Sequence, residues 1–145
     1  MATRQNIQVA LDLIKFVNIV NDLLDVSVPV ARGQVQIWDE GLQANRDMTV
    51  DEIKAILKRT CANITGYQNK LTNFLAVPEK KQLAIDGLSA IGVNLTEAKN
   101  QLTDMIVEKN YVNTQVDIAT DQPGLTAIGD HIEANVPTLP LIRRE

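Results

Sequence analysis

The stretch that decides the fold is Thr49–Ala76, which reads TVDEIKAILKRTCANITGYQNKLTNFLA. It begins with a capping box, because the Thr49 hydroxyl can accept a hydrogen bond from the third backbone amide and Glu52 can reach back. Apolar residues then recur at helical spacing within about 140° of the circumference: Val50, Ile53, Ile56, Leu57, Cys61, Ile64, Tyr67, Leu71, Phe74 and Leu75. The pattern predicts one long helix from Val50 to about Ala76, roughly 40 Å long, which Gly66 could bend.

Three shorter helices are expected after this one. Pro78 ends the long helix and is well placed to open the next at its first position, although Gly87 lowers the helix propensity of that segment. The small residues Gly87, Ser89 and Ala90 would let a neighbouring helix approach closely. The three predicted ranges are Glu79–Ile91, Asn94 to Val116, and Leu125 to about Ala134, the last preceded by a turn at 121–124.

The chain from Ile7 to Leu24 is an amphipathic helix of about five turns. Its apolar face is regular, but Leu11, Ile19 and Leu23 lie among the polar residues and form a second, smaller strip. Either another helix of the same chain or a partner protein could cover this strip. We therefore count Leu11, Ile19 and Leu23 among the candidate interface residues.

Residues 26–38 carry the only alternating pattern. Val26–Val30 and Val35–Trp38 alternate with a period of two around 31–34, which favours a short hairpin with Pro29 on an edge strand. An irregular connection is the alternative, since a two-stranded hairpin is marginal alone. Residues 41–47 are expected to be a linker or a single helical turn.

The amino-acid composition limits the folds and the classes of function that the chain can have. The chain has 145 residues, 45% hydrophobic, 22% charged and 3% aromatic, with one cysteine, one histidine and a net charge of -4. Together with the helical periodicities described above, these values predict an all-α, elongated bundle of four or five helices over residues 1–135, followed by an arm. They argue against disorder, a thiolate zinc site and a dedicated nucleic-acid binder; no apolar run is long enough for a membrane helix.

The last ten residues, VPTLPLIRRE, contain two prolines and read as an extended arm of polyproline character over 136–145. Burying its four large apolar side chains would stabilise it by about 6–12 kcal/mol, while ordering ten residues costs roughly 1–2 kcal/mol each. The arm should therefore order only against a preformed groove, on its own domain or on a neighbour. Its candidate contact residues are Val136, Leu139, Leu141, Ile142, Arg143 and Arg144.

Candidate reactive residues are few and scattered. His131 lies in Asp130-His131-Ile132-Glu133, a spacing found in zinc deaminases, but the two further thiolates of that motif are missing. Cys61 lies on the apolar face of the long helix and reads as core. The glycine spacing of 87–92 lacks the Lys-Ser/Thr of a phosphate loop. Asp51 and Glu52 are adjacent on a helix and do not face each other, and Asp39-Glu40 reads as part of a solvated turn. No catalytic, cofactor or metal site is predicted.

Trp38, the only tryptophan, is either an interface anchor or a partly buried loop residue. In length and amino-acid composition the chain is similar to small virion proteins of tailed phages, but it shares no sequence motif with them. We expect a non-enzymatic structural subunit of a multi-copy assembly, binding itself or other structural proteins. The alternatives are a monomeric helical adaptor for one protein partner, and an enzyme or small-ligand carrier.

The first residues also bear on the cellular location of the protein. Arg4 precedes an apolar stretch, as it would in an export signal, but Asp12 and Lys15 interrupt that stretch. No small-residue cleavage site follows. We therefore expect an intracellular chain that is not secreted, and one that could reside in a virion.

Overall fold

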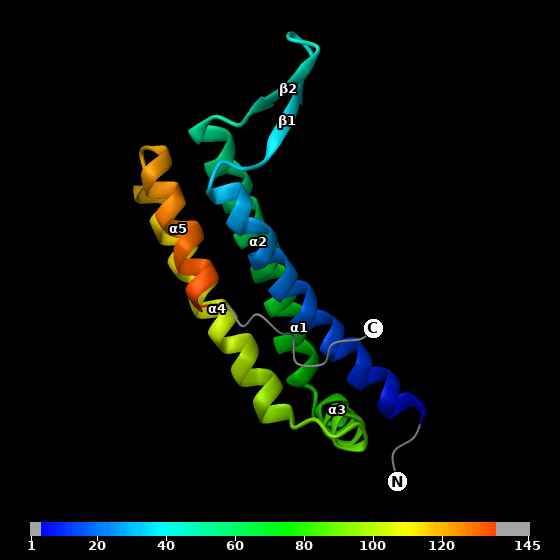
Figure 1. Ribbon diagram of the computed structural model, residues 1–145. Helices are drawn as coiled ribbons and strands as arrows, with labels where there is room; N and C mark the ends of the chain where they lie inside the picture. Colours follow the sequence, from blue (N-terminus) through cyan, green and yellow to red (C-terminus); the bar gives the residue numbers. More distant parts are fainter. Residues whose placement is uncertain (1–3, 136–145) are drawn as a thin grey trace.

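Five helices and one hairpin make up residues 4–135, the part of the chain that a computed structural model describes (Figure 1). Apart from the helix over Pro78–Ala90, which lies across one end of the bundle, the helices lie roughly along one long direction, and the hairpin projects from the other end. The prediction of an elongated all-α bundle with a short hairpin is confirmed. The elements are α1 (Arg4–Ala31), β1 (Gln36–Asp39), β2 (Ala44–Asp47), α2 (Val50–Leu75), α3 (Pro78–Ala90), α4 (Leu95–Ile118) and α5 (Gln122–Asn135).

The start signals that the sequence predicted for α2, α3 and α4 are all present. At α2 the Thr49 hydroxyl accepts from the Glu52 amide at 3.2 Å, and the Glu52 carboxylate accepts from the Thr49 amide at 2.8 Å. Pro78 opens α3 at its first position, where a helix does not use the missing amide. The Asn94 side chain accepts from the amides of Thr96 and Glu97. Helix α2 ends one residue before the predicted end.

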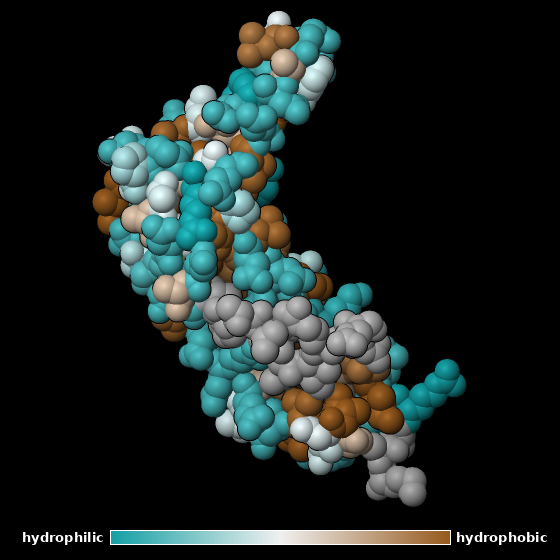
Figure 2. Space-filling view, viewed as in Figure 1, coloured by the Kyte–Doolittle hydropathy of each residue, from teal (hydrophilic) through white to brown (hydrophobic). Residues whose placement is uncertain are grey.

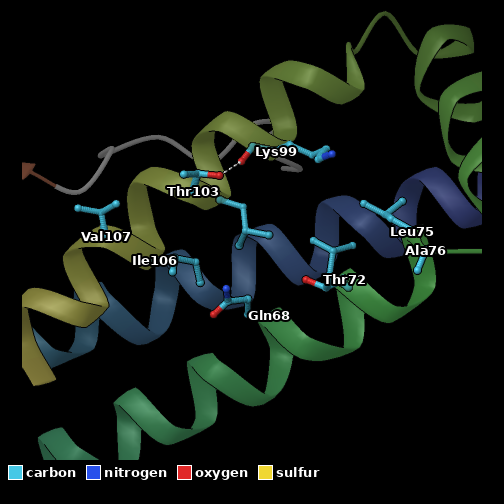
Figure 3. A pocket seen from close by; sticks show the side chains of 10 residues that line it. Gln68, Thr72, Leu75, Ala76, Lys99, Thr103, Ile106 and Val107 are labelled. Carbon is cyan, nitrogen blue, oxygen red and sulfur yellow. Dashed lines mark hydrogen bonds between the residues drawn. The ribbon is translucent and has the colours of Figure 1, made fainter.

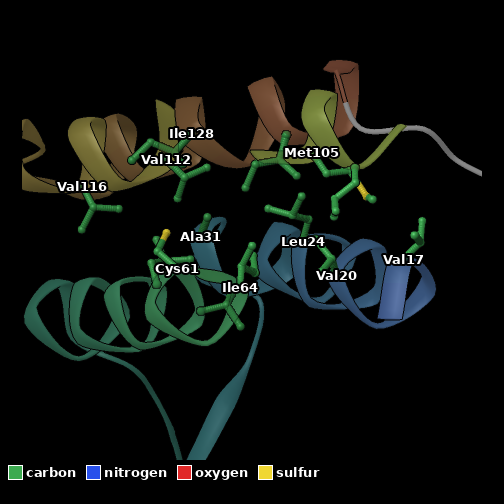
Figure 4. Packing of buried hydrophobic residues seen from close by; sticks show 14 of the residues in the cluster. Val17, Val20, Leu24, Ala31, Cys61, Ile64, Met105, Val112, Val116 and Ile128 are labelled. Carbon is green, nitrogen blue, oxygen red and sulfur yellow. The ribbon is translucent and has the colours of Figure 1, made fainter. Parts of the chain in front are cut away.

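Helix α1 is the centre of the bundle, because it packs against α2, α3, α4 and α5. Val17, Val20 and Leu24 on its inner face are each 1% exposed. Figure 4 shows this face meeting Ile64 of α2 and Met105 of α4. The core is thus one continuous aliphatic cluster that α1 shares with every other helix.

The hairpin exists, and its second predicted strand, 35–38, corresponds to β1, but the first predicted strand was wrong. Residues 26–30 continue α1, with Pro29 inside the helix, and the strands pair Gln36 with Asp47 and Asp39 with Ala44. Residues 44–47, expected in a linker or a helical turn, are β2. The helix continues because Ser27 and Ala31 are buried in phase with Leu24, and the Ser27 hydroxyl donates to the Leu23 carbonyl at 2.8 Å.

Helix α5 begins three residues earlier than predicted, since the expected turn is its first helical turn. The Asp121 carboxylate accepts from the Gly124 amide at 3.0 Å, and the Leu125 amide donates to the Asp121 carbonyl. The helix then packs against the end of α1. There Gln122 Nε2 donates to the Ala31 carbonyl at 2.9 Å, and Arg32 forms ion pairs with Asp130 and Glu133.

Gly87 allows α3 to lie very close to α1, as the small size of this residue suggested. A Cβ atom at this position would collide with the backbone carbonyl oxygen of Asn6. The contact is further tied by Asn6 Nδ2, which donates to the Leu83 carbonyl at 3.4 Å. Ser89 and Ala90, which the sequence grouped with Gly87, are exposed and take no part in it.

We expect Gly87→Ala to lower the free energy of unfolding by about 1–3 kcal/mol, because the new methyl group overpacks the contact between α1 and α3. Gly66→Ala is the matched control: its Cβ would meet nothing within 4 Å. In an exposed helix interior this change should instead stabilise by about 0.5–1 kcal/mol. Urea denaturation followed by circular dichroism measures both, and equal effects would contradict the close approach.

Candidate interaction surface

The hairpin carries two large apolar side chains into solvent. Trp38 is 54% exposed on β1, and Leu42 in the turn is 66% exposed. Figure 2 shows apolar atoms at the outer end of the hairpin, surrounded by polar ones. Because the sheet of the described residues has only these two strands, each strand presents one edge without a backbone partner from that sheet. The hairpin therefore offers both an aromatic anchor and strand edges.

Arg46 fixes the hairpin to the start of α2. Its Nε donates to Asp39 on the opposite strand at 2.7 Å, and its two terminal nitrogens donate to the Glu52 carboxylate at 2.7 and 2.9 Å. This bidentate geometry has directional specificity that a single contact lacks. One guanidinium therefore joins β1, β2 and the capping box. Trp38 alternates with Ile37 and Asp39 along β1, so it points away from this ion pair.

The same contacts stabilise the charged forms of Asp39, Arg46 and Glu52. Hydrogen bonds from Arg46, and then from the Thr49 amide, lower the pKa of Glu52 to about 2. Arg46 likewise lowers the pKa of Asp39, and the two carboxylates raise the pKa of Arg46. All three groups are therefore charged at neutral pH. The sequence assigned Glu52 its capping role but took Asp39 for part of a solvated turn and did not single out Arg46.

We expect Arg46→Ala to loosen the hairpin while the bundle stays folded. The fluorescence anisotropy of Trp38 should fall and the helical circular dichroism should not change, because the only tryptophan is on the hairpin. Arg59→Ala, at an exposed position of α2, is the control. An unchanged anisotropy in Arg46→Ala would refute the anchoring role of this ion pair.

The same contact predicts an acid transition. Glu52 has its pKa lowered from 4.5 to about 2, so its contribution to anchoring is complete above about pH 4.5 and is lost as the pH falls towards 2. In the wild type the Trp38 anisotropy should fall across that window. In Arg46→Ala, where the anchor is already absent, the fall should be much smaller.

The second strip of α1 is divided by the structure. Leu23 packs against the core, beside Tyr67 of α2. Leu11 and Ile19 are partly exposed and lie along a hollow on α1 with Ile14. The six candidate residues of the arm lie outside the described residues: Val136, Leu139, Leu141, Ile142, Arg143 and Arg144.

An apolar groove between α2 and α4 was not singled out in the sequence. It has a volume of about 410 Å³, with Leu71 and Leu102 at its base and Val107, 62% exposed, at its rim (Figure 3). Thr72 and Lys99 lie along its sides. No local pattern could have revealed it, because the relative placement of two helices creates it.

His131 is half-buried, and its partner is a residue that the sequence did not single out. Its Nδ1 lies 2.6 Å from the carboxylate of Glu108, which is 3% exposed, and its ring stacks on Tyr111 with 3.6 Å between centroids. Glu108 follows Met105 and precedes Val112 on the inner face of α4. Its helical spacing from these two buried residues was the sign in the sequence that Glu108 would be buried. The pair joins α4 to α5, which indicates a packing role.

The other candidate reactive residues also take structural positions. Cys61 is buried, burial raises the pKa of its thiol, and its Sγ lies 3.7 Å from the Lys109 carbonyl. Such a thiol is a poor nucleophile. Gly92, with a φ of 78°, terminates α3. The glycine spacing of 87–92 therefore supplies a close helix contact and a helix end.

The described residues contain neither a metal-binding cluster nor a membrane-spanning helix. Within residues 4–135, no three side chains among histidine, cysteine, aspartate and glutamate gather as a metal site would need. No helix in that range has the length and apolar character needed to cross a bilayer. Comparisons with protein-family models, curated proteins and solved structures give no match. Within residues 4–135, the exposed hairpin and the groove between α2 and α4 are surfaces suited to binding another molecule.

Proposed function

We propose that this protein is a non-enzymatic structural subunit of a multi-copy assembly, such as the head, connector or tail of a phage virion. The observation that carries the proposal is the projecting hairpin with its exposed Trp38 and Leu42. Its partners would be further copies of this chain or other structural proteins. The same proposal places the protein inside the cell and then in the particle.

The hairpin suits a contact between subunits for energetic reasons. Tryptophan is enriched among the residues that dominate binding energy at interfaces, and exposing one on a projecting element is otherwise unfavourable. Because Arg46 holds the hairpin against α2, little conformational entropy should be lost when a partner binds it. A rigid anchor of this kind suits a repeated contact in a particle.

Two observations support the non-enzymatic part of the proposal. His131 is engaged by Glu108 and Tyr111, and the Cys61 thiol is buried with a raised pKa. Both residue types are common in active sites, yet here each is committed to packing between helices. Ionisable groups that converge on a cleft would be expected of an enzyme.

The double variant Trp38→Ala/Leu42→Ala should raise the dissociation constant of the assembly by roughly 700-fold, if each side chain contributes the roughly 2 kcal/mol of a binding hot spot. Light scattering across protein concentrations measures self-assembly, and the mass of the complex isolated from the natural source measures assembly with other proteins. Val107→Ala, an equally exposed change on α4, should leave both unaltered. A strict monomer that is also isolated alone would refute the proposal.

A second candidate function is a monomeric adaptor that binds one partner. The groove between α2 and α4 favours it, because apolar side chains at its base and rim are arranged to receive a helix or peptide. In this case the isolated complex would have a small, fixed stoichiometry. The charged substitution Val107→Glu should then abolish binding, while Trp38→Ala/Leu42→Ala leaves it intact. The two variants therefore give opposite results under the two functions.

A further inference from the structure

We infer that two copies of this protein pair through the outer edge of β1, so that Trp38 of one copy lies directly opposite Trp38 of the other. The pairing joins the two hairpins into one antiparallel sheet of four strands. The inference rests on the proposed function, because it names the partner and the geometry for the exposed hairpin from which that function was argued. It commits this contact to a second copy of the chain.

The outer edge of β1 can accept another strand. One side of β1 is paired with β2, and among residues 4–135 no backbone hydrogen bond joins its other side to a further segment. Amides and carbonyls on an edge of this kind pair readily with a strand from another chain. Figure 1 shows the hairpin projecting beyond the helices, so a strand that approaches the outer part of this edge does not meet the bundle.

The two faces of the hairpin restrict the register of this pairing. Trp38 shares the exposed face with Gln36 and Asn45, while Ile37 and Arg46 lie half-buried on the other face. Residues directly opposite each other in an antiparallel pair lie on the same face of the sheet. A two-fold axis at Trp38 meets this condition, and it brings together the largest apolar side chain that each hairpin exposes.

The charges along β1 suit the same register. Counting outwards from the axis, Asp39 comes opposite Ile37 of the second copy, and Glu40 comes opposite its Gln36. No carboxylate therefore faces another carboxylate. The Asp39 side chain also keeps Arg46 as its ion-pair partner, because that contact lies within one hairpin.

Other two-fold registers are less favourable. An axis at Asp39 would place two carboxylates opposite each other, which is destabilising. An axis at Ile37 would place Trp38 opposite Gln36 and lose the contact between aromatic rings. Pairing through the edge of β2 would place two Asn45 or two Arg46 side chains at the axis, and neither arrangement buries an apolar side chain.

The size of the contact fits a repeated assembly better than an isolated dimer. Each β1 strand has only four residues, so the area buried is well below that of a typical stable interface. Two-fold contacts are the commonest between identical subunits. When further contacts hold the copies in one particle, the effective concentration of each hairpin near its partner is high, and a small contact is then sufficient.

Circular dichroism of the wild type tests the contact between the two rings. The chain has one tryptophan, so exciton coupling between two tryptophan rings can arise only between two molecules. We expect a far-ultraviolet exciton couplet that grows with protein concentration, in step with the dimer measured by light scattering. Asn45→Lys is the control, because Asn45 lies beside Trp38 on the same face but on β2. It should change neither signal, whereas Trp38→Lys should raise the dissociation constant at least tenfold.

Disulfide formation between two variants tests the register. In the inferred pairing, Gln36→Cys of one copy lies opposite Glu40→Cys of the other, with Cα atoms about 4.5–5.5 Å apart, which a disulfide can span. Two copies of the same variant would hold their new cysteines about 13 Å apart. A mixture of the two variants should therefore form disulfide-linked dimers at least tenfold faster than either variant alone. The wild type gives the background from the buried Cys61.

The possible results separate this inference from the proposed function. Assembly without the exciton couplet, equal disulfide rates for the mixture and the single variants, or assembly only with other proteins would overturn the inference and leave the proposed function in place. An Asn45→Lys variant that dimerises as poorly as Trp38→Lys would also overturn it, because the partner would then bind the face of the hairpin and not the edge of β1. A strict monomer that is isolated alone would overturn both.

Discussion

Burial of the apolar face of α1 is the interaction on which the rest of the structure depends. Val17, Val20 and Leu24 lie almost wholly inside the core, and α2, α3, α4 and α5 each place side chains against this helix. Helix α3 in particular packs mainly on α1, through the close approach at Gly87. Since each helix has one apolar stripe to remove from water, the shared surface of α1 makes the bundle a single cooperative unit.

Local signals determined how much of the fold could be predicted. Helix α2 was placed to within one residue because its capping box and its 3.6-residue period are both local. The first strand of the hairpin was misplaced because Ser27 and Ala31, which hold the end of α1 in the core, are too small or too polar to register as a hydrophobic pattern. Strand β2 reads Ala-Asn-Arg-Asp, residues with little β preference, and the ion pair of Arg46 with Glu52, at the start of α2, helps to hold it.

Local signals revealed only part of the candidate surfaces. Trp38 could be singled out as the only tryptophan, but its exposure depends on the direction in which the hairpin leaves the bundle. The groove between α2 and α4, and the pair of Glu108 with His131, each join residues that lie far apart in the chain. Tertiary geometry creates such features, and a single sequence carries only weak signs of them, such as the phase of Glu108 with Met105.

The pairing of the first and last helices has a consequence for synthesis on the ribosome. Arg32 and its partner Asp130 are 98 positions apart, and α5 is the last of the described helices to be translated. At roughly 5–20 residues per second, the α5 side of α1 waits on the order of 5–20 s for its cover. During that interval the nascent chain displays aliphatic side chains to solvent, so it should be a client for chaperones that hold emerging polypeptides.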